Sequence, residues 1–181
     1  MRSISVPVLL LTGPTGVGKS PVLGAASSLL SEAGVLHASV TLSDIGRLYP
    51  APGDDEFNER IAHRNLRSLW SNYAREGAQR LLLERVLETR TLLQRISTAV
   101  PGADITVVRL RAPLPLLRDR ITARQAGDPA WYLEAAKYLD TVFETAGVED
   151  FAIDNVDRSV RDVAADVLRL AGWSSQHAPD A

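Results

Sequence analysis

The chain has 181 residues, of which 45% are hydrophobic and 23% are charged, and its formal net charge is -2 at pH 7. These values predict one soluble globular domain and exclude a general electrostatic attraction to nucleic acid or to an anionic membrane as the default. The sequence contains no cysteine, which excludes disulfides, thiolate nucleophiles and cysteine metal ligands and is consistent with a cytoplasmic protein. The apolar run that stops at Gly13 is too short to span a bilayer.

Short apolar runs alternate with helical patterns along the chain. In chain order, we expect strands at residues 6–11, 35–40, 80–87, 105–110 and 151–154. The expected helices are 19–33, one between the loop at 50–55 and Gly77, one that Thr89 caps and Pro101 ends, one beginning at Pro113, 131–146, and one that Ser159 caps and Gly172 ends. Because the strands are continuous apolar runs, we expect a three-layer α/β domain over residues 4–173, with a parallel sheet covered by helices on both faces. Residues 174–181 are predicted to form a disordered tail.

The segment from Gly13 to Ser20 carries the strongest functional signal. It reads Gly13-Pro14-Thr15-Gly16-Val17-Gly18-Lys19-Ser20 and matches the P-loop pattern Gly-x-x-x-x-Gly-Lys-Ser in full, between an expected buried strand and an expected helix. Glycines let the backbone aim successive N–H groups inward, which forms an anion-binding nest at the helix N-terminus. Lys19 can reach the β- and γ-phosphates and Ser20 can ligate Mg²⁺. The segment therefore predicts binding of a nucleoside triphosphate, ATP, together with Mg²⁺.

Pro21, which follows the loop, is unusual at this position. P-loop proteins commonly donate the backbone N–H of this residue to the α-phosphate, and proline has no N–H, although its fixed φ suits the first turn of a helix. Loss of one charge-assisted hydrogen bond would cost roughly 1.5–3 kcal/mol of nucleotide affinity. Either a neighbouring arginine replaces this donor, or the protein binds the nucleotide loosely or turns it over poorly.

The P-loop near the N-terminus, the five expected strands and an arginine-bearing helix after the fourth strand make nearly the whole chain resemble the small P-loop kinases. This group includes gluconate, shikimate, adenylylsulfate and nucleotide kinases and chloramphenicol phosphotransferase. The resemblance implies strand order 2-3-1-4-5, and ATP and Mg²⁺ as cofactors. It also implies a small-molecule acceptor bound beyond the carboxyl ends of strands 1 to 3. No nucleic-acid or membrane partner is expected, and the chain is predicted to be a monomer or a homodimer.

The resemblance also indicates three candidate acceptor residues. Asp44, after the second strand, is placed where related kinases use an aspartate to orient the acceptor hydroxyl or accept its proton; the alternative is that it caps a short helical turn. Arg47 is spaced to bind an anionic acceptor, or is a solvated arginine. Glu88 is preferred over Glu84 as a carboxylate near Mg²⁺ or the acceptor, because we expect Glu88 at the end of the third strand; the alternative is a helix N-terminal carboxylate paired with Arg90.

Two arginines of the helix after the fourth strand are further candidates by their position in the resemblance. Arg120 matches the arginine that packs near the nucleotide base, and Arg124 matches the lid arginine that reaches the transferred phosphoryl group. Helical spacing places these two residues on adjacent turns, while Arg118 points elsewhere. A solvated helix face is the alternative for both. Residues 124–131 would form a short lid with a glycine hinge.

The residues around the start of the third helical pattern are less specific. Asp54 and Asp55 are expected to cap this helix and to occupy its first turn. Its apolar positions are Phe57, Ile61, Leu66, Leu69, Trp70 and Tyr73. His63, Arg64 and Asn65 cannot all face one way, and one of them is a candidate for lining the acceptor cleft, with a buried histidine or a surface arginine as the alternative.

The sequence is compatible with two functions. The first is an ATP- and Mg²⁺-dependent phosphotransferase that acts on a small-molecule hydroxyl or phosphate, with Lys19, Asp44 and Arg124 as its catalytic residues. The second is a nucleotide-binding P-loop module with little or no turnover, which Pro21 and the late position of Asp44 favour. The sequence names no acceptor for the first function.

Overall fold

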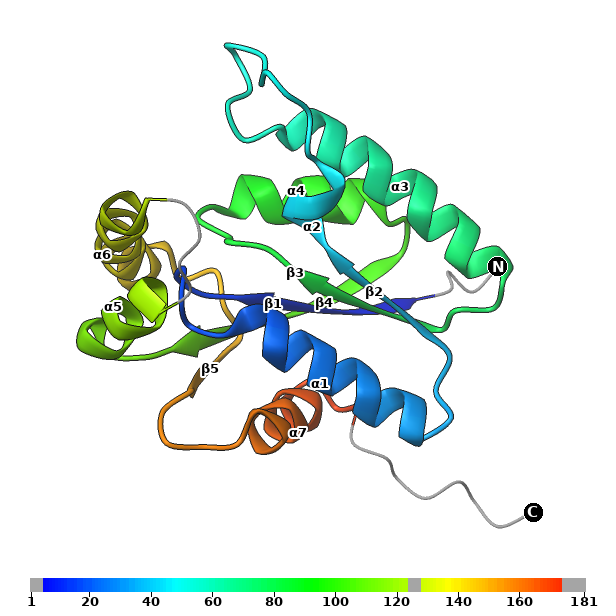
Figure 1. Ribbon diagram of the computed structural model, residues 1–181. Coiled ribbons are helices and arrows are strands. Elements are labelled where there is room, and N and C mark those ends of the chain that lie inside the picture. The colour runs from blue at the N-terminus through cyan, green and yellow to red at the C-terminus, as the bar shows by residue number, and fades with distance from the viewer. Residues whose placement is uncertain (1–4, 124–127, 174–181) are drawn as a thin grey trace.

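The computed structural model describes residues 5–123 and 128–173, and its five strands form one parallel sheet in the order β2-β3-β1-β4-β5 (Figure 1). The strands are β1 (Val6–Thr12), β2 (His37–Thr41), β3 (Arg80–Glu84), β4 (Ala103–Arg111) and β5 (Phe151–Asp154). This is the strand order that the resemblance implied, and the three-layer α/β fold is confirmed. Residues 124–127, which include Arg124 and half of the predicted lid, and the predicted tail at 174–181 lie outside the described residues.

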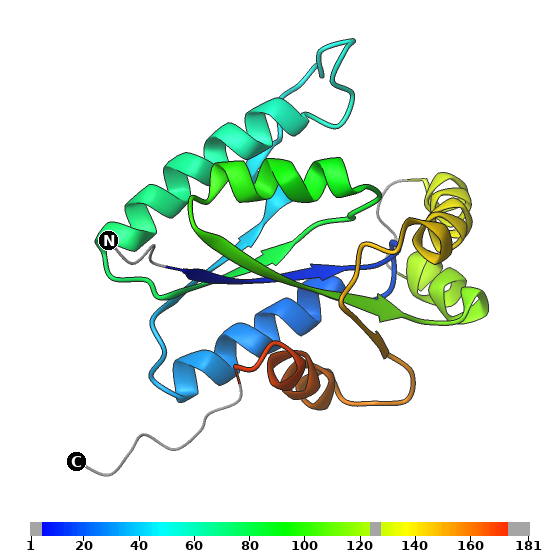
Figure 2. The ribbon, with the colours of Figure 1, turned by 180° about the vertical axis from the view of Figure 1, so that it is seen from behind.

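Helices lie against both faces of the sheet. They are α1 (Lys19–Glu32), α2 (Leu42–Ile45), α3 (Glu59–Arg75), α4 (Arg90–Ala99), α5 (Leu114–Ala123), α6 (Pro129–Ala146) and α7 (Val160–Leu170). Figures 1 and 2 show α3 and α4 side by side on one face and α1 and α7 on the other, while α5 and α6 pack together beyond the end of β1 that leads into α1. No helix of the described part of the chain is long and apolar enough to cross a membrane.

The core has two halves, one on each side of the sheet. Leu9 and Leu11 of β1 pack into the half beneath α1 and α7, whereas Val8 and Leu10 pack into the half beneath α3 and α4. All four of these side chains are at most 1% exposed, because the central strand is covered on both faces. This two-sided burial is the reason that β1 is a continuous apolar run rather than an alternating one.

The register of the sheet brings the carboxyl ends of the strands to one edge. Leu11 of β1 pairs with Glu84 of β3, and Thr12 pairs with Arg109 of β4, so the P-loop begins directly beside both neighbouring strands. Thr12 is fully buried, and its Oγ1 accepts a hydrogen bond of 2.9 Å from the backbone N–H of Leu87. This bond ties the loop after β3 to the end of β1.

The structure corrects two predicted boundaries. β3 ends at Glu84 instead of residue 87, because the N–H of Leu87 bonds to the Thr12 side chain instead of to a neighbouring strand. α3 begins at Glu59, so Phe57 lies before the helix and is 61% exposed. The caps by Thr89 and Ser159 are confirmed, since their side chains accept hydrogen bonds from backbone N–H groups of α4 and α7.

Candidate phosphate-binding and acceptor site

Three glycines shape the P-loop between β1 and α1. Gly13, Gly16 and Gly18 have φ values of 138°, 84° and 97°, a region of backbone conformation that favours glycine. A Cβ atom on Gly13 would lie 2.5 Å from the carbonyl oxygen of Leu110, and one on Gly18 would lie 2.7 Å from Asn155 Nδ2. The loop therefore needs glycine for its backbone conformation and for its close packing against β4 and the segment after β5.

Two side chains from other parts of the chain hydrogen-bond to the backbone of the P-loop. Asn155, which follows β5 and is 6% exposed, donates a hydrogen bond of 2.8 Å from Nδ2 to the carbonyl oxygen of Val17. Arg120 of α5 donates to the same carbonyl at 3.3 Å and to the carbonyl of Asn155 at 3.1 Å. Sequence reasoning missed Asn155, whose only signal was its position after the last strand. The nucleotide contact of Arg120 stays a prediction, but the structure places its guanidinium directly against the loop.

The predicted functional side chains of the loop are Lys19 and Ser20. Lys19 Nζ donates to the carbonyl oxygens of Gly13 and Pro14 at 2.9 and 3.1 Å, which places the ammonium group against the first residues of the loop. Ser20 Oγ donates a hydrogen bond of 3.0 Å to Glu84 Oε1 at the end of β3. The contact joins the first turn of α1 to the strand beside the P-loop.

The carboxylate that contacts Ser20 is Glu84, whereas sequence reasoning preferred Glu88 as the carboxylate near Mg²⁺ or the acceptor. Glu84 is 8% exposed, and its second oxygen accepts a longer contact of 3.4 Å from Thr41 Oγ1 of β2. The preference for Glu88 rested on a strand that continued to residue 87; because β3 ends at Glu84, Glu88 lies in the loop before α4. An acceptor role for Glu88 stays a prediction.

The chemistry of Ser20 and Glu84 fits Mg²⁺. A hydroxyl and a carboxylate are hard oxygen donors, which Mg²⁺ prefers over nitrogen or sulfur. Within the described residues, no group of three or more histidine, cysteine, aspartate or glutamate side chains is arranged to hold a metal ion. Proteins usually hold Mg²⁺ through one or two side chains, with phosphates and water completing the shell.

Asp44 and Arg47 form an ion pair with each other. Asp44 lies in the four-residue helix α2, immediately after β2, and Arg47 Nη2 donates to its Oδ1 at 2.5 Å. Both side chains are more than half exposed. α3 supports the backbone of α2, because Asn65 Nδ2 donates a hydrogen bond of 2.7 Å to the carbonyl oxygen of Ile45. The structure therefore brings the two predicted acceptor residues together on a supported turn, and their role stays a prediction.

Neither a protein-family model nor a curated protein matches the sequence, but solved structures match the fold over almost the whole chain. A gluconokinase from Sinorhizobium meliloti is 16% identical with a TM-score of 0.58, and the match covers 95% of this chain and 96% of that one. A shikimate kinase from Acinetobacter baumannii, in complex with shikimate, is 20% identical with a TM-score of 0.60 over 92% and 93% of the two chains. A tunicamycin resistance protein from Deinococcus radiodurans is 18% identical with a TM-score of 0.64 over 93% and 97%.

The chain has the fold of the small P-loop kinases. Identities of 16–20% establish the architecture and leave the activity and the substrate of this chain open. The resemblance found in the sequence is thereby confirmed at the level of the fold.

On the acceptor side of this P-loop kinase fold, the structure reveals a half-buried polar network that sequence reasoning missed. Arg85, the residue after Glu84, forms an ion pair with Glu59, the first residue of α3, and the two side chains are 14% and 11% exposed. Burial lowers the pKa of Arg85, and the charges of Glu88 and Asp55 oppose this shift. Arg85 Nε and Glu59 Oε2 are buried without a hydrogen-bond partner among the described residues, which is uncommon for buried polar atoms.

Asp55 stabilises the beginning of α3 beside this network. Its carboxylate accepts hydrogen bonds from the backbone N–H groups of Glu59 at 2.8 Å and Arg60 at 3.0 Å, which confirms a capping contact. The predicted first-turn position is wrong for both aspartates, because α3 begins at Glu59 and its N-cap residue is Asn58. Asp54 forms a bidentate pair with Arg60, with both contacts at 2.8 Å. Both aspartates therefore serve the loop and the helix that border the acceptor side of the fold.

Proposed function

We propose that the chain is an ATP- and Mg²⁺-dependent phosphotransferase that moves the γ-phosphoryl group of ATP to a hydroxyl or phosphate group of a small molecule. The observation that carries the proposal is the pairing of the P-loop Ser20 with Glu84 at the carboxyl end of β3. A glycine-shaped phosphate loop alone suits many nucleotide-binding proteins, whereas a carboxylate held against its serine suits a site that also positions Mg²⁺. Two solved structures with this fold, a gluconokinase and a shikimate kinase, are named as small-molecule kinases.

Lys19 and the N–H groups of the P-loop bind the phosphates in this proposal. The ammonium group already lies beside the loop, at the carbonyl oxygens of Gly13 and Pro14, and a small side-chain rotation moves it toward the β- and γ-phosphates. Mg²⁺ bound between ATP and Ser20 would neutralise part of the phosphate charge. Glu84 is a positioning residue: it accepts a hydrogen bond from the Ser20 hydroxyl, so that the lone pairs of Ser20 Oγ remain available to the cation.

Asp44 orients the acceptor. As the acceptor oxygen bonds to the γ-phosphorus, the bond to the β–γ bridging oxygen breaks and ADP leaves, and Asp44 accepts the proton of the acceptor hydroxyl. The pair with Arg47 is exposed, so exchanging it for an acceptor costs little. Arg47 then binds an anionic group of the acceptor, with Glu88 as a weaker polar contact.

Arg120 and Arg124 complete the site in this proposal. Arg120 is fixed against the P-loop and lies between it and the segment after β5, which suits a contact with the nucleotide. Arg124, which lies outside the described residues, stabilises the charge on the phosphoryl group during transfer.

A nucleotide-binding module with little turnover is the second candidate, and two observations favour it. Pro21 offers no N–H to an α-phosphate, and Asp44 is already neutralised by Arg47 at 2.5 Å. Such a module would bind ATP through the P-loop without an acceptor.

Acceptor-stimulated release of ADP separates the two candidates. A coupled assay over a panel of metabolites and nucleosides should find at least one compound that raises ADP release above the rate with water alone. The same compound should leave a Lys19→Ala variant inactive. If no compound raises ADP release from a protein that binds ATP, the second candidate stands and the first fails.

A further inference from the structure

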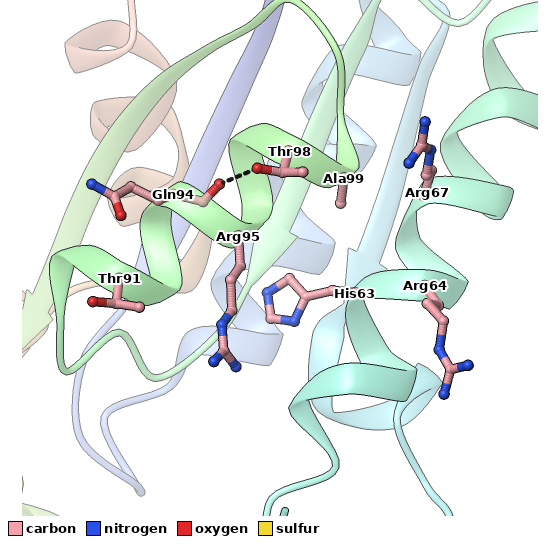
Figure 3. A pocket seen from close by; sticks show the side chains of 8 residues that line it. All are labelled: His63, Arg64, Arg67, Thr91, Gln94, Arg95, Thr98 and Ala99. Atoms are coloured by element: carbon pink, nitrogen blue, oxygen red, sulfur yellow. Dashed lines mark hydrogen bonds between the residues drawn. The ribbon is translucent and has the colours of Figure 1, made fainter.

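A cavity of about 320 Å³ lies between α3 and α4, at the low end of the usual range for small-molecule pockets. Figure 3 shows its side chains reaching from both helices, with the His63 ring between them. The lining residues are His63, Arg64, Arg67, Thr91, Gln94, Arg95, Thr98 and Ala99. Three are arginines, one is a histidine, and none is an acid, although the whole chain carries a net charge of -2.

The three arginines of this pocket have no counter-ion in the described structure. Arg64, Arg67 and Arg95 form no side-chain hydrogen bond or ion pair with any residue in 5–123 or 128–173. Most of the other described arginines are paired with an acid: Arg109 with three acids, for example, and Arg60 with Asp54. All three residues line the same pocket, and an anion bound there would offset part of their positive charge.

His63 supplies a directed polar atom in the same pocket. Its Nδ1 hydrogen-bonds to the carbonyl oxygen of Glu59 at 2.6 Å, so Nδ1 carries the proton in the neutral ring. Nε2 is buried and has no hydrogen-bond partner among the described residues. Burial first, and the charge of Arg95 second, lower the pKa of His63, while Asp55 opposes the shift. When the His63 ring is protonated, Nε2–H can donate a hydrogen bond to an anion in the pocket.

We propose that the pocket between α3 and α4 binds the phosphate group of a small molecule, through the guanidinium groups of Arg64, Arg67 and Arg95 and through His63 Nε2. Guanidinium forks match phosphate oxygens in geometry and charge. Thr91, Gln94 and Thr98 add neutral polar groups at the rim.

This site is separate from the P-loop. α4 runs back from the carboxyl end of β3 toward the start of β4, and the pocket extends along it to Thr98 and Ala99 in its last turn. The P-loop lies at the opposite edge of the sheet from that last turn. The described residues that line the pocket include none from the P-loop, so we expect phosphate binding between α3 and α4 to persist without Lys19.

The imidazole signals of the chain provide a site-specific test. The sequence has three histidines, so a His63→Gln variant assigns the signal of His63 in a proton NMR titration. Pyrophosphate should raise the pKa of His63, because a bound anion favours the charged ring. Sodium chloride at the same ionic strength controls for screening. Arg95→Gln should weaken pyrophosphate about tenfold or more, whereas Arg75→Gln, on the same helix as His63 but outside the pocket, should have little effect.

The outcomes separate this proposal from the proposed function. A Lys19→Ala protein should keep the full response of His63 to pyrophosphate. If that variant loses the response, the phosphate binds at the P-loop instead. The proposal is also overturned if pyrophosphate moves His63 no more than sodium chloride does, or if Arg75→Gln and Arg95→Gln weaken the response equally.

Discussion

Replacing Glu84 with glutamine tests the pairing on which the proposed function depends. Of its two contacts, only the one from Ser20 at 3.0 Å lies within the usual range for a hydroxyl donor, since that from Thr41 is 3.4 Å. One hydrogen bond to a charged group contributes about 1.5–3 kcal/mol, which corresponds to roughly 10- to 150-fold in affinity. Because glutamine keeps one acceptor oxygen, we expect a loss near the lower end of this range, about tenfold.

Calorimetry with and without Mg²⁺ measures this loss. The factor by which Mg²⁺ tightens ATP should fall about tenfold in Glu84→Gln, while the affinity for ATP in EDTA should stay the same or rise slightly, because a negative charge near the phosphates is removed. The free energy of unfolding should change little, since a buried charge is replaced by a neutral group of the same shape.

Glu88→Gln is the matched control, because it makes the same chemical change in the loop beyond β3. It should leave the effect of Mg²⁺ on ATP affinity intact. An unchanged Mg²⁺ effect in Glu84→Gln, or an equal loss in both variants, would refute the assignment of Glu84 as the residue that positions Ser20.

Three further substitutions test the other parts of the site. Pro21→Thr restores a backbone N–H and should tighten ATP by up to about 1.5–3 kcal/mol; unchanged affinity in calorimetry would show that another donor already serves the α-phosphate. Asp44→Asn should leave ATP affinity nearly unchanged and lower the transfer rate by roughly 10²–10⁴-fold, and a smaller loss in steady-state assays would show that the residue only orients the acceptor. Arg124→Ala should lower kcat strongly and leave the Kd for ATP within a few-fold, because its contact belongs to the transition state. Lysine at this position should rescue only part of the rate. Arg118→Ala is the control for Arg124, and a damaged Arg118 variant beside a normal Arg124 variant would contradict the assigned helix face.

The fold and the P-loop could be predicted from the sequence because their signals are local or periodic. The run Val8–Leu11 is buried on both faces of the sheet, and this burial leaves a continuous apolar pattern that can be read without knowing the partners. The glycines of the P-loop need left-handed backbone conformations, which few other residues tolerate, so that their spacing alone identifies the turn. The caps Thr89 and Ser159 are equally local, since each bonds within its own helix.

The rest of the site depends on contacts between distant residues, which leave no local pattern. β3 ends at Glu84 because the backbone N–H of Leu87 donates to the side chain of Thr12 on β1. The sequence does not show this contact, so the strand was predicted to continue to residue 87 and Glu88 was preferred over Glu84. Asn155 and Val17 are separated by more than a hundred residues, so the bond that fastens the P-loop could not be read from spacing.

The start of α3 was misplaced for a related reason. Asp55 caps the helix from four residues before Glu59, and the loop between them carries Phe57 into solvent. A helical hydrophobic pattern cannot register such a turn, because Phe57 happens to fall at a helical spacing from Ile61. The Arg85–Glu59 ion pair could not be predicted for the same reason, because Glu59 is the first residue of α3.

The most direct test of the central claim, that this P-loop binds the phosphates of ATP, is calorimetry of ATP and adenosine with the wild-type and Lys19→Ala proteins. Lys19 lies beside the phosphate loop, at the carbonyl oxygens of Gly13 and Pro14, and the proposal gives it contacts with phosphate and none with adenosine. The account predicts that Lys19→Ala weakens Mg²⁺–ATP by at least about tenfold and leaves adenosine unchanged. Equal weakening of both ligands, or ATP binding that survives the substitution intact, would contradict it.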